Sequence, residues 1–213
     1  AWKTAVSGRP GPVVIGLPEN ILTEFSNAKI SSPIFVNEPS PNISSLEKIE
    51  DILSAAKTPL VMAGGGGWTQ EGKNNLKSFV ERENLPFIAL FRCQDIFDNH
   101  SNNYIGDAGV GMAEYIEETI KTSDVILAIN SRFGEISTKG WSLFNINHPT
   151  QKIIHTHSSD FELGKIVNPE LAIHSGPNEI SRCLYQKFKI KKDNSNFKNR
   201  LRELRDKFIS FSK

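Results

Sequence analysis

Short, almost wholly apolar runs recur along the middle of the chain and alternate with longer segments whose apolar residues follow a helical period. The apolar runs lie at residues 59–63, 86–91, 125–129, 152–156 and 171–174. Segments with an amphipathic helical pattern lie at residues 45–56, 70–83, 112–122 and 177–188. Runs that are apolar at nearly every position are typical of parallel strands buried on both faces. The pattern therefore predicts an α/β fold, a doubly wound parallel sheet of about five or six strands with helices on both faces.

The N-terminal part of the chain departs from this alternation. Residues 1–7 have the character of the end of a helix already under way, which suggests a piece of a longer protein. Residues 13–17 form one more apolar run, preceded by glycine and proline and closed by Pro18, so we expect a short strand there. Residues 23–44 are rich in proline, serine and asparagine and show little periodicity, which predicts an extended linker.

The C-terminal stretch combines an apolar stripe with many basic residues. The stripe has helical spacing and consists of Phe197, Leu201, Leu204, Phe208 and Phe211. From Lys187 onwards there are ten Lys or Arg against three acidic residues, although the whole chain has a net charge of only +1. A basic tail can bind nucleic acid, but a stripe of this period indicates a helix packed on a partner surface, with the basic residues solvated. We favour the packed helix and expect no nucleic-acid partner.

Two further features limit the class of protein. The chain has neither an apolar run of the roughly 18 residues that a membrane helix needs nor a signal peptide at its start. We therefore expect a cytoplasmic protein with no membrane partner. The two cysteines, Cys93 and Cys183, could form one disulfide, but we interpret them as isolated small hydrophobic residues.

Candidate binding residues follow the predicted strands. Ligands of parallel sheets bind at the carboxyl ends of the strands, which here are residues 64–67, 91–94, 130–135 and 155–159. The glycines at 64–67 would let a phosphate approach the next helix N-terminus, or they serve only a tight turn. Arg132 could pair with a phosphate through its guanidinium, or it could form a salt bridge with Glu135.

Three other motifs are rejected on their residues. Residues 67–74 are nearly a phosphate-binding P-loop, but Asn74 stands where the magnesium-binding Ser or Thr belongs. Residues 106–109 with Asn130 differ from a Gly-Asp-Gly…Asn motif at the third position, so we interpret Asp107 as a turn or helix-start residue. His155 and His157 face the same way along a strand but lack a third ligand, and we predict no metal site.

Several segments together resemble one enzyme family. Residues 7–20, with the block Gly-Arg-Pro-Gly-Pro-Val, resemble the end of the pyrimidine-binding domain of acetolactate synthases and their relatives. Residues 55–66, which end in three glycines, resemble the start of the central domain, and residues 122–133 and 152–157 continue it in the same order. Over nearly its whole length the chain thus resembles thiamine-diphosphate-dependent enzymes, in particular an acetolactate synthase-like branch with a Gly-Asp-x-Gly-Val-Gly loop, found here at residues 106–111.

The resemblance implies a chemistry for a larger parent protein. Such enzymes have three α/β domains, and thiamine diphosphate with Mg²⁺ binds between the first and third domains of two subunits of a homodimer or homotetramer. The carbanion of the cofactor attacks a 2-oxo acid, carbon dioxide leaves, and the enamine adds to a second carbonyl. The glutamate that activates the cofactor and the motif that holds magnesium belong to regions that this sequence does not contain. We therefore expect the chain alone to be inactive, with no catalytic residue of its own.

The resemblance also assigns places within that parent. It makes residues 1–22 the end of the pyrimidine-binding domain, 23–44 a linker, 45–190 the central Rossmann-like domain, and 191–213 a helix towards the third domain. Central domains of this family are structural or bind FAD or ADP, and the contacts carried over by position are Gly64, Gly65, Gly66 and Arg132. The alternative is a free-standing dinucleotide-binding regulatory module without catalysis.

Overall fold

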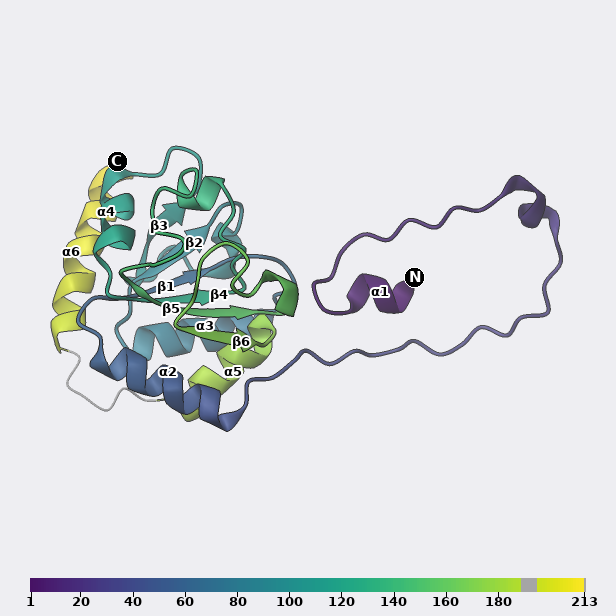
Figure 1. Ribbon diagram of the computed structural model, residues 1–213, viewed down its shortest axis with the longest axis horizontal. Coiled ribbons are helices and arrows are strands. Elements are labelled where there is room, and N and C mark those ends of the chain that lie inside the picture. The colour runs from purple at the N-terminus through teal and green to yellow at the C-terminus, as the bar shows by residue number, and fades with distance from the viewer. Residues whose placement is uncertain (189–194, 213) are drawn as a thin grey trace.

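The computed structural model of the protein describes residues 1–188 and 195–212. Among these residues, a six-stranded sheet has the strand order β3-β2-β1-β4-β5-β6, and every neighbouring pair is parallel (Figure 1). The strands are β1 (Pro59–Ala63), β2 (Phe87–Leu90), β3 (Tyr104–Ala108), β4 (Val125–Ile129), β5 (Lys152–His157) and β6 (Leu171–His174). The chain winds outwards from β1 on one side and from β4 on the other, so these two strands meet where the winding reverses. The predicted doubly wound parallel sheet is confirmed.

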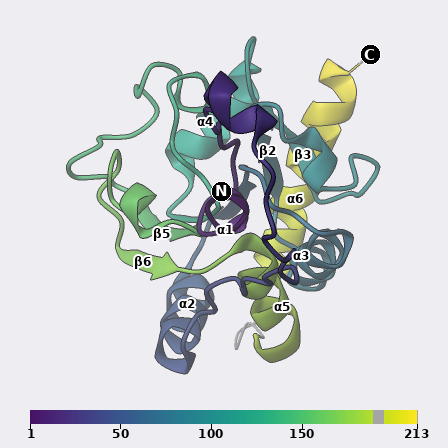
Figure 2. The same cartoon turned by 90° about the vertical axis from the view of Figure 1, so that its right-hand side faces the viewer.

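Helices cover both faces of this sheet. The α-helices are α1 (Trp2–Val6), α2 (Ile43–Ala55), α3 (Gln70–Arg82), α4 (Glu114–Thr122), α5 (Pro177–Lys187) and α6 (Ser195–Phe211). Short 3₁₀ helices are η1 (Glu19–Thr23), η2 (Gln94–Ile96), η3 (Ile136–Thr138) and η4 (Asp160–Glu162). Successive strand residues point to opposite faces, so Val61 packs with α2, α3 and α5, whereas Leu60 packs with α4 and α6. Figure 2 shows the strands between α4 and the layer of α2, α3 and α5.

Strand β3 is an element that the apolar pattern does not reveal. It contains Gly106 and Asp107, which are poor strand formers, and it lies at an edge of the sheet. Asp107 pairs in register with Ala89 of β2, and its Oδ2 accepts a hydrogen bond from Gln94 Nε2 at 3.3 Å. The expectation that Asp107 is a turn or helix-start residue is therefore wrong. Pairing with β2 stabilises an extended backbone that the local sequence does not favour.

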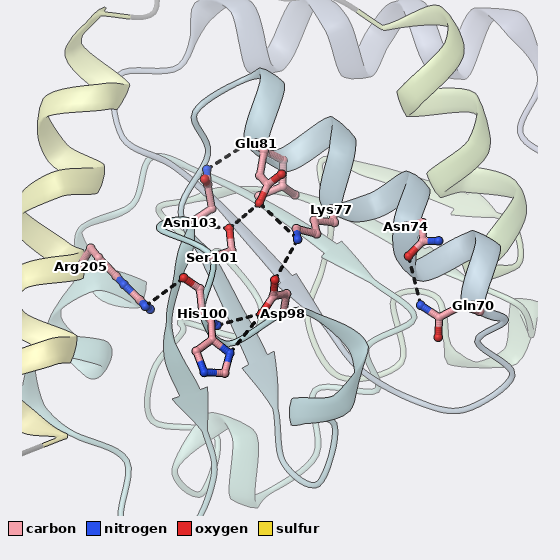
Figure 3. Close-up of polar contacts among 10 residues, drawn as sticks. Gln70, Asn74, Lys77, Glu81, Asp98, His100, Ser101, Asn103 and Arg205 are labelled. Atoms are coloured by element: carbon pink, nitrogen blue, oxygen red, sulfur yellow. Dashed lines mark hydrogen bonds and ion pairs between the residues drawn. The ribbon is translucent and has the colours of Figure 1, made fainter.

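A polar network ties α3 to the loop that precedes β3 (Figure 3). Lys77 Nζ lies 2.8 Å from Asp98 Oδ2. Asn103 Nδ2 donates hydrogen bonds to the carbonyl oxygens of Val80 at 3.1 Å and Leu85 at 2.8 Å. Asn103 is buried, so these bonds also satisfy a polar side chain away from water. The network holds the start of β3 beside β2.

The strand expected at residues 13–17 is not formed. This stretch lacks strand pairing in the structure, and the side chain of Val14 is 94% exposed. A strand requires a neighbour for its backbone N–H and C=O groups, and none of the described residues supplies one. Figure 1 shows the N-terminal arm (residues 1–42) running out from the domain as a long loop between α1 and α2. Its last residues return to the domain, where Glu38 Oε2 accepts hydrogen bonds from the N–H groups of Asn178 at 3.1 Å and Glu179 at 3.2 Å.

Helix α6 carries the C-terminal apolar stripe and packs it on a surface of the same chain. Phe197, Leu201 and Leu204 are buried in the two cores beside the sheet, whereas Phe211 at the end of the stripe is 64% exposed. Figure 1 places this helix on the side of the domain opposite the arm. The prediction of an amphipathic helix is confirmed. The surface on which it packs is the domain, at the amino ends of the strands.

Two arginines of α6 point into the domain. Arg200 Nη1 donates to the carbonyl oxygen of Pro59 at 2.8 Å, and Arg205 Nη1 donates to that of Tyr104 at 2.6 Å. These arginines are thus engaged with backbone at the starts of β1 and β3, rather than offered as a surface for nucleic acid. The part of the basic tail at residues 189–194 and 213, with the domain boundary expected at residue 190, lies outside the described residues.

Candidate functional site

Two clefts open where β1 and β4 end side by side, in register at Ala63 and Ile129. The larger has a volume of about 570 Å³ and lies between Gly65, residues 90–93 and residues 132–137. The smaller, of about 220 Å³, is lined by Arg9, Pro10, Gly65, Gly66, Asn130, Arg132, His157 and Ser158. Gly65 and Arg132 line both clefts. The structure therefore brings together the glycine loop and the arginine that the sequence singled out, at the reversal point where doubly wound sheets bind ligands.

The glycine loop after β1 has a conformation that requires glycine at one position. Gly65 has φ 68°, in the left-handed region, and a Cβ there would lie 2.5 Å from Asn130 Nδ2. The same Nδ2 donates a hydrogen bond to the carbonyl oxygen of Gly66 at 2.9 Å, which holds the loop against the end of β4. Gly64 belongs to the lining of neither cleft, and a Cβ there would meet Leu90 Cδ1 at 2.7 Å. Gly64 is thus a packing position, whereas Gly65 and Gly66 face the clefts.

Arg132 is exposed at the junction of the two clefts. Within residues 1–188 and 195–212, its guanidinium has no hydrogen bond or ion pair. The alternative interpretation, a salt bridge with Glu135, is therefore not formed, although Glu135 lines the larger cleft. A guanidinium without a partner beside a glycine loop can bind a phosphate through bidentate hydrogen bonds.

Two further arginines line the clefts. Arg9 comes from the N-terminal arm, and its Nη1 lies 3.5 Å from Glu162 Oε1. The guanidinium of Arg92 lies 5.0 Å from the ring centre of Phe91 at the side of the larger cleft. Arg9 is thus already paired with a carboxylate, and Arg92 and Arg132 are the arginines of the linings that favour an anionic ligand.

Two titratable groups of the clefts, His157 and Cys93, favour their neutral forms. Burial lowers the pKa of His157, although its hydrogen bond with the Ser159 backbone opposes this. Burial likewise raises the pKa of the Cys93 thiol, although its contact with the Gly65 backbone opposes this. Neither group therefore adds charge to the site at neutral pH.

In the structure, residues of the rejected motifs are engaged with partners inside the chain. Lys73, the lysine of the near P-loop, has its Nζ 2.6 Å from Asp95 Oδ2. His155 Nε2 lies 2.7 Å from the carbonyl oxygen of Ser131, and His157 Nδ1 accepts from the N–H of Ser159 at 2.9 Å. In the described part of the chain, no group of three or more His, Cys, Asp or Glu could hold a metal ion.

Cys93 and Cys183 are both free, so the alternative of a disulfide is wrong. Of the helices described, none is long and apolar enough to cross a membrane.

Sequence reasoning missed two residues of the site. The sequence places Asn130 in a strand-end loop and in a rejected magnesium motif but gives it no role, whereas its amide joins the glycine loop to β4. Arg9 was noted only as part of the Gly-Arg-Pro-Gly-Pro-Val block, because the linker separates it from the central domain in sequence. The signal for Asn130 was its place at a strand end. For Arg9 no local pattern could have indicated the site.

The chain is similar in sequence to known proteins. Residues 46–184, more than half of the chain, match the family described as thiamine pyrophosphate enzyme, central domain. The chain is 26% identical to the acetolactate synthase large subunit of Corynebacterium glutamicum, in an alignment that covers 90% of this chain. It is 30% identical to that of Buchnera aphidicola, over 81% of this chain. It is 27% identical to the glyoxylate carboligase of Escherichia coli over 82%. It spans only 31%, 31% and 30% of these relatives. The family match over residues 46–184, together with the doubly wound fold, places the chain in the family of central domains of thiamine pyrophosphate enzymes.

Proposed function

We propose that the chain is the central part of a thiamine-diphosphate-dependent carboligase or decarboxylase of the acetolactate synthase type, acting on a 2-oxo acid. Its named relatives are acetolactate synthases and a glyoxylate carboligase. The chain itself serves as a scaffold without turnover of its own. Asp107 of the near-match motif lies in β3 and accepts a hydrogen bond from Gln94, and the described residues contain no group of three or more His, Cys, Asp or Glu that could hold a metal ion. The comparisons give no support to a free-standing regulatory module.

The partners in this proposal are the first and third domains of the same enzyme, within a homodimer or homotetramer in the cytoplasm. The N-terminal arm supports the first of these contacts. Its apolar side chains are largely exposed, as at Val14 (94%), Ile30 (101%) and Phe35 (92%). Apolar surface of this extent is typical of a segment that packs against another body. In this proposal, residues 1–22 end the preceding domain, 23–44 link it to the central domain at 45–190, and 191–213 lead on to the next.

We also propose that the two clefts bind ADP or the ADP portion of FAD. The observation that supports this most is the uncommitted Arg132 beside Gly65 and Gly66, with Arg92 adding positive charge. The diphosphate would lie against the glycine loop and the arginines, where backbone N–H groups and guanidinium groups favour anions. In this proposal Gly64 does not contact the nucleotide, and it serves as a packing position at the start of the loop.

Isothermal titration calorimetry with ADP and with FAD tests the nucleotide site. We expect Arg132→Ala to weaken binding by at least about tenfold, as expected for loss of a charge-assisted bond, and Arg132→Lys to retain part of the affinity. Arg202→Ala is the control, because Arg202 is an exposed arginine of α6 remote from the clefts. Equal affinity in the wild type and Arg132→Ala would remove Arg132 from the site. No binding of either nucleotide by the wild type would refute the nucleotide proposal.

A further inference from the structure

The segment that carries Arg132 has an unusual backbone. Asn130, with φ 54°, and Phe133, with φ 48°, both lie in the left-handed region on either side of it. Trp141, with φ 60°, shares this conformation, which is rare for a bulky side chain. Such conformations persist only where the surrounding structure enforces them, and they concentrate at functional sites.

Two ring N–H groups hold the peptide carbonyls on either side of Arg132. His155 Nε2 lies 2.7 Å from the carbonyl oxygen of Ser131. Trp141 Nε1 donates to the carbonyl oxygen of Phe133 at 3.1 Å. The hydroxyl of Ser131 also accepts from the N–H of Phe133 at 3.1 Å. The backbone before and after Arg132 is therefore fixed, while its guanidinium has no bond to any of the described residues.

His155 has the properties of a permanent donor. It is 1% exposed, and its ring meets Phe133 edge to face, with centroids 5.0 Å apart. Burial lowers its pKa to about 4, so the ring is neutral at physiological pH. Its Nδ1 has no partner among the described residues, so the single ring proton resides on Nε2, where the Ser131 carbonyl accepts it. A leucine would fill this place without leaving a buried nitrogen unpaired, which argues that the histidine is there for its N–H.

We propose that His155 and Trp141 are positioning residues that fix the direction of Arg132 toward the phosphate groups of the nucleotide. This inference rests on the nucleotide site proposed above. An arginine whose backbone is already ordered loses less conformational freedom on binding, so the ligand is held more tightly. Neither residue lies in the diphosphate contact itself. Their effect on binding must therefore pass through Arg132.

The test compares variants of the full chain. His155→Leu removes the N–H, His155→Gln retains an N–H at a similar place, and Trp141→Phe removes the second donor from a side chain that is 44% exposed. His174→Leu is the matched control, since His174 Nε2 also lies near a strand-end carbonyl, that of Ser158 at 3.1 Å, but the side chain is exposed on β6. Each variant is examined by hydrogen–deuterium exchange of peptides covering residues 130–134 and by calorimetry with ADP, alone and combined with Arg132→Ala.

We expect His155→Leu and Trp141→Phe to exchange faster at residues 130–134 and to bind ADP about three- to tenfold more weakly. His155→Gln and His174→Leu should resemble the wild type. Combined with Arg132→Ala, neither change should weaken ADP binding further. Unchanged exchange, or an equal loss of affinity without Arg132, would overturn the inference.

Two outcomes of the test separate this inference from the proposed function. If His155→Leu does not fold, Trp141→Phe decides the inference by the same criteria, because its side chain lies at the surface. If the wild type binds neither ADP nor FAD, the nucleotide proposal fails and so does the ligand part of this inference. Exchange at residues 130–134 then still decides whether the two rings hold the segment.

Discussion

Gly65 and Gly66 are adjacent residues with opposite structural demands, which makes their substitution by alanine a sharp test of the site. Gly65 has φ 68°, and a Cβ there would lie 2.5 Å from Asn130 Nδ2 and 2.7 Å from Asn130 O. Gly66 is outside the left-handed region, and a Cβ there would meet nothing within 4 Å. The two changes add the same methyl group to the same loop, so any difference between them arises from the tertiary structure.

The expected change in the free energy of unfolding is the sum of three contributions. A left-handed alanine costs about 1–2 kcal/mol, and displacing Asn130 weakens its hydrogen bond to the Gly66 carbonyl, which is worth about 1 kcal/mol. Against this, alanine restricts the unfolded chain and stabilises by about 0.4–1 kcal/mol. Gly65→Ala should therefore lower the free energy of unfolding by about 2 kcal/mol. Gly66→Ala should leave it unchanged or raise it by up to about 1 kcal/mol, since only the unfolded-state effect applies.

Urea unfolding followed by far-ultraviolet circular dichroism measures both free energies. A third variant, Gly65→Asn, separates the two effects at Gly65, because asparagine tolerates the left-handed region but still carries the Cβ. It should fall between Gly65→Ala and the wild type. Equal stabilities for Gly65→Ala and Gly66→Ala would refute the description of this loop, and with it the reason that the loop can approach a phosphate.

Two further predictions concern titration and packing. Burial lowers the pKa of His155 to about 4 from 6.5. The stability that depends on its neutral ring is therefore complete above pH 6.5 and is lost as the pH falls from 6.5 to 4, by up to about 3 kcal/mol. Urea titrations at stepwise pH should show this loss in the wild type and a smaller one in His155→Gln. Arg205→Ala should reduce the free energy of unfolding by about 1–3 kcal/mol, because the Tyr104 carbonyl loses its donor. The control Arg202→Ala, at an exposed position, should change it by less than about 0.5 kcal/mol. Equal effects in these two variants would show that α6 does not depend on its inward arginine.

The sequence alone determined the fold class and most of the elements. Strands β1 and β4 are apolar at every position because both faces of each are buried, and that burial is what the sequence pattern records. Helices α3 and α5 were predicted by the spacing of their apolar residues, which reflects the single face that each buries. The start of α2 was predicted less well. The apolar pattern indicates a start near residue 45, but the N-cap is Asn42, whose Oδ1 accepts from the N–H of Ser45 at 2.8 Å.

Only the tertiary structure decided the elements and contacts that depend on distant partners. Strand β3 exists because β2 pairs with it, although Gly106 and Asp107 disfavour a strand. Residues 13–17 are apolar enough for a strand but have no neighbour, so their backbone stays unpaired. At the site, the sequence could name Gly65 and Arg132 because ligands gather at strand ends. It could not show that Arg9 joins them, or that His155 and Trp141 hold the carbonyls beside Arg132. Those contacts arise from the folding of segments that no local pattern links.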